Sequence, residues 1–306
     1  MNNKNKIIPI ISGIIYSTLF GLTFMFSSIG LRFTSPFALL SMRFGIAFIV
    51  MSILVFLKII KINFKNKDLK TLFLLGLMQP ILYFIFETYA IKNTATSVAG
   101  TLIALIPISV AISSSYFLKE KPTKAQYGFI LASIVGVIII VVLGGQNNAS
   151  GNFMGIILLF GAVISATIFN LLSRKLSTTF TPAETTYFMM GIAFFAFTLI
   201  ALVEGLSQGT LNKFFLPFYN LDFLLSLLFL GVIASIIGFF LVNFTLSKME
   251  ATKASVFSNL STVVSIIAGV IFLGESFKFF QIIGAILILI GVWGTNKFGQ
   301  NNNNQE

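Results

Sequence analysis

The sequence predicts an all-α integral membrane protein in which ten transmembrane helices form two inverted five-helix repeats. Three observations predict this fold: a series of about ten apolar stretches, a bias of Lys and Arg toward alternate loops, and an internal similarity between the two halves of the chain. Because the hydrocarbon core of a bilayer is roughly 30 Å thick, a helix needs about 20 residues to cross it. Each apolar stretch is long enough to form one span.

The composition is typical of a chain embedded in lipid. Of its 306 residues, 57% are hydrophobic and 9% are charged, and the mean hydropathy is +0.98. A soluble domain of this length does not need so much apolar surface. The chain contains neither His nor Cys, which excludes zinc sites of the usual kind, haem ligation by His, Ser-His-Asp triads, iron–sulfur clusters and disulfides. We expect no cofactor, no metal and no enzymatic activity.

The apolar stretches place the helices in order along the chain. We predict helices at residues 7–28, 35–57, 70–91, 97–118, 124–143, 153–172, 183–203, 222–245, 254–273 and 277–295. The first stretch is longer than a signal-peptide core and lacks a small-residue cleavage pattern, so we interpret it as a retained helix. We expect the polar C-terminal tail, residues 296–306, to be disordered.

Short motifs mark helix starts and interruptions. Ser35-Pro36 and Thr181-Pro182-Ala183-Glu184 each have an N-cap residue followed by Pro at the first helical position, and the second motif makes Glu184 part of a capping box. Pro80 and Pro107 interrupt the third and fourth apolar stretches and predict bends near the midplane of the membrane.

Other residues have an architectural interpretation. Glu120 and Glu275 lie between predicted helices, and we expect them to shape helix hairpins instead of contacting substrate. Small residues recur at every fourth position in the first and fifth helices, a spacing that lets helix backbones approach closely. They are Gly13, Ser17 and Gly21, and Gly128, Ala132 and Gly136.

The positions of the basic residues predict the topology. A net charge of +11 would suggest a nucleic-acid partner in a soluble protein, but here the basic residues follow the loops. With ten spans, 15 of the 20 Lys and Arg lie on the side of the N-terminus, four lie on the other side, and Arg43 lies within a span. Cytoplasmic loops are rich in Lys and Arg. We therefore predict a bacterial cytoplasmic-membrane protein with both termini in the cytoplasm, which binds no nucleic acid.

The two halves of the chain share short matches at nearly constant offsets. At an offset of 155, Phe117-Leu118-Lys119-Glu120 matches Phe272-Leu273-Gly274-Glu275, and Gly136-Val137 matches Gly291-Val292. At an offset of 146, Gly45-Ile46-Ala47-Phe48 matches Gly191-Ile192-Ala193-Phe194.

These matches divide the chain into repeats at residues 1–145 and 152–306, each with five helices. Because five is an odd number, the second repeat must enter the membrane in the opposite orientation to the first. Inverted repeats of this kind characterise secondary transporters, whose two halves alternately open a central site to each side.

The motifs also resemble a known family. Phe20-Gly21-Leu22-Thr23-Phe24, followed by Ser35-Pro36 and Arg43-Phe44, is similar to the opening of a repeat in the EamA family of the drug/metabolite transporter superfamily, and Phe272-Leu273-Gly274-Glu275 with Gln281 through Gly291 is similar to the close of one. The likeness covers nearly the whole chain. It implies a ten-helix exporter of amino acids, drugs or other small metabolites. Departures from the pattern occur at Phe20, where Trp is common, at Lys119, which replaces Gly, and at Met189, the counterpart of Arg43.

Two charged residues within the predicted spans, Arg43 and Glu87, are candidate substrate residues. A charge in hydrocarbon costs at least a few kcal/mol unless it is paired or hydrated. Gln79, Tyr83 and Glu87 recur at every fourth position, which would place three hydrogen-bonding groups on one face of the third helix. Structural roles are open for both charges: Arg43 in an ion pair or snorkelling, and Glu87 balanced by Lys92.

Further candidates complete the predicted substrate-binding set. Asn243 and Asn259 are expensive to bury, and Tyr16 lies in a polar stripe of the first helix. Stripes of Ser and Thr on the first and ninth helices have the alternative role of holding helices together.

No nucleotide motor is encoded, because the chain has no G-x-x-x-x-G-K-[ST] motif. We therefore predict a secondary-active transporter, an exporter of a small-molecule substrate, driven by the substrate gradient, by exchange or by an ion. If protons are the coupling ion, Glu87 is the best carrier. The alternatives are uptake by the same mechanism, a non-transporting scaffold or lipid carrier, and a membrane-embedded enzyme, which would need convergent carboxylates or a metal.

Overall fold

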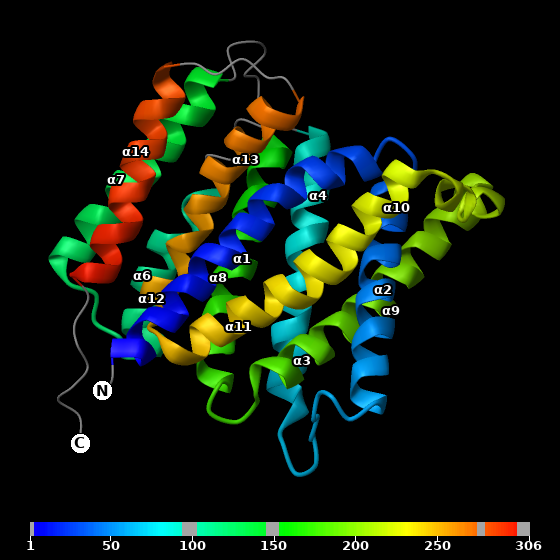
Figure 1. Ribbon diagram of the computed structural model, residues 1–306, viewed down its shortest axis with the longest axis horizontal. Helices are drawn as coiled ribbons and strands as arrows, with labels where there is room; N and C mark the ends of the chain where they lie inside the picture. Colours follow the sequence, from blue (N-terminus) through cyan, green and yellow to red (C-terminus); the bar gives the residue numbers. More distant parts are fainter. Residues whose placement is uncertain (1–2, 94–102, 145–152, 274–278, 299–306) are drawn as a thin grey trace.

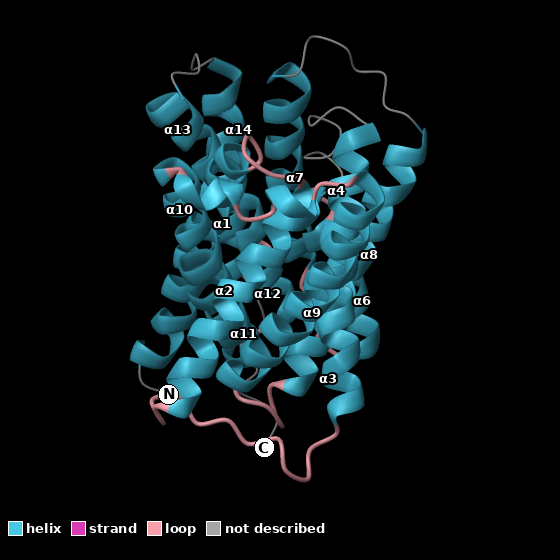
Figure 2. Ribbon diagram, turned by 90° about the vertical axis from the view of Figure 1, so that its right-hand side faces the viewer, coloured by secondary structure: helices cyan, strands magenta, loops and turns pink. Residues whose placement is uncertain are grey.

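The computed structural model describes residues 3–93, 103–144, 153–273 and 279–298, and within these ranges all regular structure is helical (Figures 1 and 2). The α-helices are α1 Asn3–Gly30, α2 Pro36–Phe56, α3 Leu69–Gly76, α4 Tyr83–Asn93, α6 Ile106–Phe117, α7 Lys124–Gly144, α8 Phe153–Leu176, α9 Pro182–Gln208, α10 Leu221–Leu228, α11 Phe239–Lys248, α12 Ala251–Ser255, α13 Phe257–Leu273 and α14 Phe279–Lys297. Two π-helical segments, η1 Leu77–Leu82 and η4 Phe229–Gly238, join α3 to α4 and α10 to α11, and two 3-10 turns, η2 Leu211–Lys213 and η3 Leu216–Tyr219, precede α10. The predicted all-α class is confirmed for the described residues.

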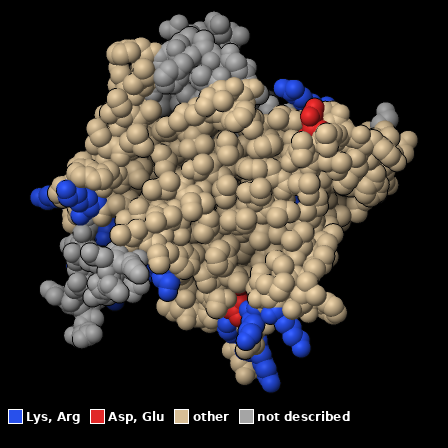
Figure 3. All heavy atoms as spheres, in the orientation of Figure 1, with Lys and Arg blue, Asp and Glu red and all other residues tan. Residues whose placement is uncertain are grey.

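Six helical runs are long and apolar enough to cross a membrane: Ile7–Ser27, Pro36–Phe56, Leu69–Ala90, Phe153–Leu176, Pro182–Gln208 and Leu221–Lys248. Three shorter apolar helices accompany them in the described part of the chain, Ile106–Phe117, Lys124–Ile139 and Ile282–Lys297. On the face shown in Figure 3, charged side chains gather toward the edges, and a broad surface between them is uncharged. Such a surface suits the hydrocarbon core of a bilayer, and the chain is a membrane protein.

The helix boundaries differ from the sequence-based ones in several places. The predicted helix 254–273 is two helices, α12 and α13, which are separated at Val256. Within the described residues a turn at Ala104 and Leu105 interrupts the fourth apolar stretch before α6 begins at Ile106, and residues 97–102 of the predicted helix lie outside the described ranges. Helix α14 runs to Lys297, into the tail that was predicted to be disordered, and residues 299–306 also lie outside the described ranges.

Proline interrupts the third span, as predicted. Gln79 has φ −144° and ψ 124°, which is extended backbone, and it separates α3 from α4. The cause is Pro80, because the pyrrolidine ring disfavours the α conformation in the residue before it and supplies no N–H. Pro107 acts differently: it lies in the first turn of α6, where a missing N–H costs nothing, so it starts a helix instead of bending one.

Helices α2 and α9 form a closely packed antiparallel pair at one side of the bundle (Figure 1). Ser41, near the start of α2, is hydrogen-bonded to Thr198 at 2.8 Å, and Ser52, near its end, is hydrogen-bonded to Tyr187 at 3.3 Å. Between these two hydrogen bonds, a glycine on each helix leaves room for a phenylalanine ring of the other helix. A Cβ atom at Gly45 would lie 3.1 Å from the Phe194 ring, and one at Gly191 would lie 3.1 Å from the Phe48 ring.

Helices α7 and α14 form a second antiparallel pair at the opposite side (Figure 1). A Cβ atom at Gly136 would lie 2.5 Å from the Gly284 carbonyl oxygen, and one at Gly291 would lie 2.6 Å from that of Phe129. The predicted close approach is therefore confirmed at Gly136. It is wrong at Gly128, where a Cβ atom would meet nothing within 4 Å.

The close approach predicted for the small residues of α1 occurs against α13. A Cβ atom at Gly13 would lie 2.7 Å from the Phe257 ring, and one at Gly21 would lie 2.6 Å from Val264. The two predicted N-caps are also present. The Ser35 hydroxyl accepts from the Ala38 N–H, and Thr181 and Glu184 form the reciprocal capping box of α9. The start of α1 and the end of α14 lie at the same end of the bundle (Figure 1).

Candidate functional site

Arg43 lies in the interior, at the centre of the candidate site. It is on α2, about 10 Å along the axis from the first residue of that helix, and only 4% of its surface is exposed. Its Nε donates a 2.8 Å hydrogen bond to the Ser235 hydroxyl of η4. Its guanidinium carbon lies 5.3 Å from the ring centroids of both Phe44 and Phe84. Arg43 therefore does not snorkel, because it is held between helices from both halves of the chain.

Glu87 faces the same region from α4. The Tyr83 hydroxyl, one turn earlier, donates a 3.1 Å hydrogen bond to Glu87 Oε1. The charges of Glu87 and Arg43 are close enough to interact electrostatically, but no nitrogen–oxygen pair between them reaches the 4.0 Å limit of an ion pair, and Arg43 uses Ser235 instead. The structure thus brings the two intramembrane charges together without pairing them directly.

Gln79 does not share the face predicted for it. The extended backbone at Gln79 breaks the helical register, so the spacing of four residues from Gln79 to Tyr83 no longer places them one above the other. The spacing from Tyr83 to Glu87 lies wholly within α4, and those two side chains do meet. The side chain of Gln79 makes no hydrogen bond within the described part of the chain and is half-buried.

The other candidates contact their neighbours in a packing role. The Asn243 Nδ2 donates to Thr186 at 3.1 Å, and its Oδ1 accepts from Ser173 at 2.7 Å, which joins α11 to α9 and α8. Asn259 donates to Ser133 at 3.0 Å, which joins α13 to α7. The Asn243 amide uses both its oxygen and its nitrogen within the protein, which leaves few hydrogen-bonding positions for a ligand, and Asn259 uses its nitrogen.

Tyr16 has a similar role. Its hydroxyl donates a 2.7 Å hydrogen bond to the Ala254 carbonyl, which joins α1 to α12, and its ring is buried. Most hydroxyls of the predicted polar stripes also bond to their own helix, for example Ser12 to the Ile8 carbonyl and Ser255 to the Thr252 carbonyl. The structural interpretation of these hydroxyls fits their contacts.

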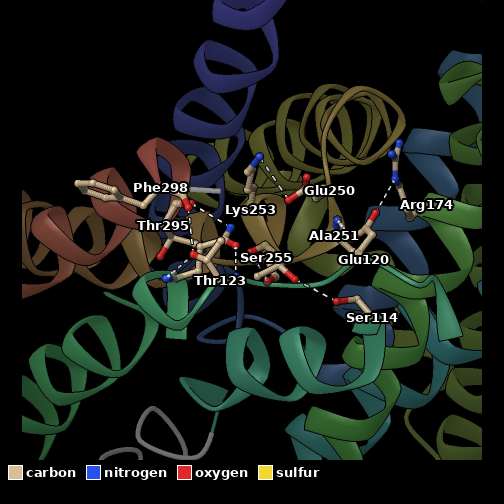
Figure 4. A network of polar contacts seen from close by, with 12 residues as sticks. Ser114, Glu120, Thr123, Arg174, Glu250, Ala251, Lys253, Ser255, Thr295 and Phe298 are labelled. Carbon is tan, nitrogen blue, oxygen red and sulfur yellow. Dashed lines mark hydrogen bonds and ion pairs between the residues drawn. The ribbon is translucent and has the colours of Figure 1, made fainter. Parts of the chain in front are cut away.

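A polar network at the end of the bundle where α14 ends was not predicted (Figure 4). Glu120 Oε1 accepts from Arg174 Nε at 3.1 Å, and Oε2 accepts from the Ala251 N–H at 2.8 Å. Arg174 Nη1 also donates to the Leu246 and Ser247 carbonyls, at 3.2 Å each. The loop before α7 is therefore tied to α8, α11 and α12.

Glu120 thus shapes helix connections as predicted, although across the two halves and not within one hairpin. Burial raises the pKa of Glu120, and the hydrogen bond and charge of Arg174 oppose that effect. The second-half counterpart, Glu275, lies outside the described residues. The partner Arg174 was missed because nothing in the local sequence links residues 54 positions apart.

Glu184 has partners beyond its capping box. Lys67 Nζ lies 2.7 Å from Glu184 Oε2, and the Asn63 N–H donates to Oε1 at 2.9 Å. These bonds hold the loop between α2 and α3 against the start of α9. Among the described residues, no three Asp or Glu side chains gather as a metal site would require.

A hollow of about 330 Å³ lies where the loop after α8 meets α9 and α11. It is lined by residues 177–182 together with Phe244, Ser247 and Lys248. None of the predicted substrate residues lines it. It lies beside the network around Arg174, whose Nη1 bonds to the Ser247 carbonyl, and not beside Arg43.

Sequence comparison gives the relatives of the chain. Residues 7–142 and 153–297 each match the model of the EamA-like transporter family. The uncharacterized transporter YcxC of Bacillus subtilis is 38% identical over 286 residues, 94% of this chain and 92% of that protein. The probable amino-acid metabolite efflux pump of Salmonella typhimurium is 26% identical over 288 residues, 92% of each chain.

A solved crystal structure shares the fold, with a TM-score of 0.72 over 96% of this chain and 98% of the other at 18% identity. The helical architecture and the apolar spans are consistent with the two matches to the family model. The chain belongs to the EamA-like transporter family.

Proposed function

We propose that this protein is a secondary-active transporter with ten transmembrane helices in two inverted repeats, which exports a small metabolite from the cytoplasm by alternating access. The observation that carries the proposal is the antiparallel packing of equivalent helices from the two repeats. A protein built in this way has two conformations of similar energy, in which the same site opens to opposite sides of the membrane.

The pair α2 and α9 supports the inverted repeat. These helices contain the matched motifs Gly45 to Phe48 and Gly191 to Phe194. Each Phe of one motif packs at the Gly of the other, and the helices run in opposite directions. Reciprocal contact between equivalent positions is the mark of a two-fold axis. An axis between two antiparallel spans inverts one repeat relative to the other.

The pair α7 and α14 gives independent support. Gly136 and Gly291 are equivalent at an offset of 155 residues, and each approaches a backbone carbonyl of the other helix, at Gly284 and Phe129 respectively. Gly284 and Phe129 are themselves 155 residues apart. A two-fold relation with a similar offset therefore recurs at both sides of the bundle.

The same arrangement supports the proposed ten-span topology. The described α3–η1–α4 and α10–η4–α11 runs each count as one span, α12 with α13 as another, and the shorter α6, α7 and α14 complete the set. An even number of spans places both termini on one side. The excess of Lys and Arg on that side supports a cytoplasmic location for both.

The proposed substrate site lies around Arg43. The Nη1 and Nη2 atoms of Arg43 donate to no acceptor within the described residues, and a guanidinium edge suits a carboxylate or another planar anion. Tyr83 and Glu87 complete the site from the third span, and Gln79 lies at the break of that span, where its side chain makes no hydrogen bond to a described residue. Asn243, Asn259 and Tyr16 hold the surrounding helices together, because each donates a hydrogen bond to another helix of the protein.

Proton coupling through Glu87 fits its position. Glu87 is the carboxylate within α4, where it accepts a hydrogen bond from the Tyr83 hydroxyl, and a carboxylate within a span is a candidate proton carrier. Export is the proposed direction because the Salmonella typhimurium relative is described as an efflux pump. Uptake by the same mechanism is the alternative direction, since alternating access is reversible.

Metabolite profiling tests the proposal. Bacteria that express the wild type, Arg43→Ala, Arg32→Ala or an empty vector are compared for intracellular and extracellular small molecules. Arg32→Ala is the matched control, because Arg32 is exposed. We expect one compound to fall inside and rise outside with the wild type and with Arg32→Ala only. Accumulation inside would indicate uptake, and no change despite confirmed membrane expression would contradict transport in that host.

A further inference from the structure

The connection between α2 and α3 carries a cluster of exposed lysines. It runs from the end of α2 at Phe56 to the first turn of α3, which starts at Leu69. Four of its lysines are exposed, and none of the four lies within 4.0 Å of a carboxylate of a described residue. These four, the loop lysines, are Lys58, Lys61, Lys65 and Lys70. On the face shown in Figure 3, Lys and Arg side chains gather at the end of the bundle where Figure 1 places this connection.

The carboxylates beside the loop lysines are already in use. Glu184 Oε2 lies 2.7 Å from Nζ of Lys67, the fifth lysine of the connection. Asp68 caps α3: its Oδ1 accepts from the Lys70 N–H at 3.0 Å, and its Oδ2 accepts from the Thr71 hydroxyl at 3.2 Å. The outer side of the connection therefore has four ammonium groups against the one carboxylate of Asp68. A surface with such an excess of positive charge attracts anions.

The connection has a fixed shape. Its inner side is tied to the start of α9 through the bonds to Glu184, and the Phe64 ring packs against Phe180 and Phe188, with centroids 6.4 Å and 6.1 Å away. Lys58 and Asn66 have φ values of 58° and 61°, the left-handed conformation that occurs in tight turns. Because the inner side is anchored in this way, the loop lysines are presented together on the outer side.

Large apolar side chains adjoin the loop lysines. Phe56, Leu57 and Ile59 are 85%, 57% and 66% exposed. They lie at the end of Pro36–Phe56, one of the helical runs long enough to cross a membrane. Apolar side chains at the end of a span lie at the boundary between the acyl chains and the lipid headgroups. The lysines that follow them in the chain are therefore expected at the level of the headgroups.

The topology of the chain does not by itself account for this arrangement. Lysines in a loop bias its orientation through their charge alone, whatever the shape of the loop. A fixed backbone, carboxylates that are already bonded and adjoining apolar side chains are additional features. A surface that is ordered before it binds loses less conformational entropy on binding. These features are typical of a binding surface at the headgroup level.

We propose that the loop lysines bind the headgroup phosphates of anionic phospholipids, while Phe56, Leu57 and Ile59 contact the adjoining acyl chains. This inference goes beyond the proposed transport function and does not depend on it. Each Lys close to an anionic bilayer surface strengthens the attraction about fivefold. A phospholipid without net charge offers no such gain, so the surface discriminates between the two kinds of lipid. A bilayer reaches the lysines and the apolar side chains at the same time, because both adjoin the end of a span.

The test compares two lipids that have identical acyl chains and differ in charge. Phosphatidylglycerol or phosphatidylcholine is added to the purified full chain in a neutral detergent, and the increase in Tm is measured. We expect phosphatidylglycerol to reach its half-maximal effect at a concentration about tenfold or more below that of phosphatidylcholine. A rise in NaCl from about 0.05 M to about 1 M should remove this preference through screening. The soluble headgroup analogue glycerol 1-phosphate should have no effect at the concentrations at which phosphatidylglycerol acts.

Two variants that lose the same charge show whether the loop itself is the site. One has Lys58→Gln, Lys61→Gln, Lys65→Gln and Lys70→Gln. The control carries Gln at four other exposed lysines, which form no ion pair with a described residue and which the proposed topology places on the same side of the membrane: Lys121, Lys124, Lys175 and Lys248. The loop variant should need about tenfold or more phosphatidylglycerol for the same effect. The control variant should keep the preference of the wild type.

Four outcomes overturn the inference. Phosphatidylglycerol that acts no better than phosphatidylcholine, or a preference that persists in about 1 M NaCl, excludes recognition by exposed charge. Equal losses in the two variants assign the effect to the net charge of the protein and not to the loop. Glycerol 1-phosphate that is as effective as the lipid indicates a site for free phosphate groups. Because the lipid and salt comparisons need only the wild type, they decide the question even if a variant fails to fold.

Discussion

Phe48 and Phe194 stack on each other, with ring centroids 6.0 Å apart and 23° between the ring planes. They are equivalent residues of the two repeats, at the offset of 146 that relates Gly45 to Gly191. A residue that contacts its own equivalent lies beside the axis that relates the two copies. At this contact the two repeats therefore pack against each other through equivalent residues. Equivalent substitutions in the two repeats should then have similar effects.

Bulky substitutions at Gly45 and Gly191 should have similar effects. A Cβ atom at either glycine would lie 3.1 Å from the Phe of the other repeat, so Gly45→Val and Gly191→Val should each lower the free energy of unfolding by about 1–3 kcal/mol. Thermal unfolding of the purified variants measures this. Gly128→Val is the matched control, because a Cβ atom there meets nothing within 4 Å. A large effect at one glycine and none at the other would contradict the two-fold packing.

Removal of the Ser235 hydroxyl should destabilise the protein by leaving Arg43 Nε without its acceptor. A buried donor without a partner costs about 1–3 kcal/mol, and more when it is charged. Ser235→Ala should therefore lower the Tm and also weaken transport, because Arg43 loses its anchor. Ser226→Ala is the matched control, since among the described residues the buried Ser226 hydroxyl bonds only to the Asp222 carbonyl of its own helix. Equal effects of the two variants would refute a special role for Ser235.

Local signals predicted the helices, the caps and one break. Each depends on a few consecutive residues: Thr181 with Glu184 fixes the start of α9, and Pro80 ends α3 through its ring. This break made the site prediction wrong at Gln79. The prediction assumed regular helical spacing across Pro80, and the proline abolishes that spacing. The type of element could be predicted, but not the register across its interruption.

Partners distant in sequence could not be predicted. The cost of burying Asn243 was clear from the sequence. Its acceptor Thr186 and its donor Ser173, however, lie on other helices, and only tertiary packing brings them to Asn243. Arg174 gave no local signal of its bond to Glu120 for the same reason. The polar residues within spans could thus be found from the sequence, while the division between structural and ligand-binding roles needed the contacts.

Glu120 should make stability depend on pH. Burial raises its pKa in the folded protein, so the folded state binds the proton more tightly than the unfolded chain. The resulting stabilisation is fully present below the unfolded pKa and is lost as the pH rises through the folded pKa. The Tm difference between wild type and Glu120→Gln should therefore shift in favour of the wild type as the pH falls from about 8 to about 4. Glu120→Ala removes the same titrating group and should show the same pH dependence. A Tm difference between wild type and Glu120→Gln that is constant across this pH range would contradict the predicted effect of Glu120.

Cysteine labelling should establish the topology that the inverted repeat requires. The chain has no natural Cys, so each introduced thiol reports only its own position. Lys65, between α2 and α3, and Asn212, between α9 and α10, are both exposed and should lie on opposite sides of the membrane. In intact cells a membrane-impermeant maleimide should label Asn212→Cys and not Lys65→Cys, and in inverted vesicles the pattern should reverse. Lys248→Cys, at the end of α11, should behave like Lys65→Cys, because an even number of spans separates them. Labelling of Lys65→Cys and Asn212→Cys from the same side would contradict the inversion of the second repeat, and with it the alternating-access mechanism that depends on two opposed halves.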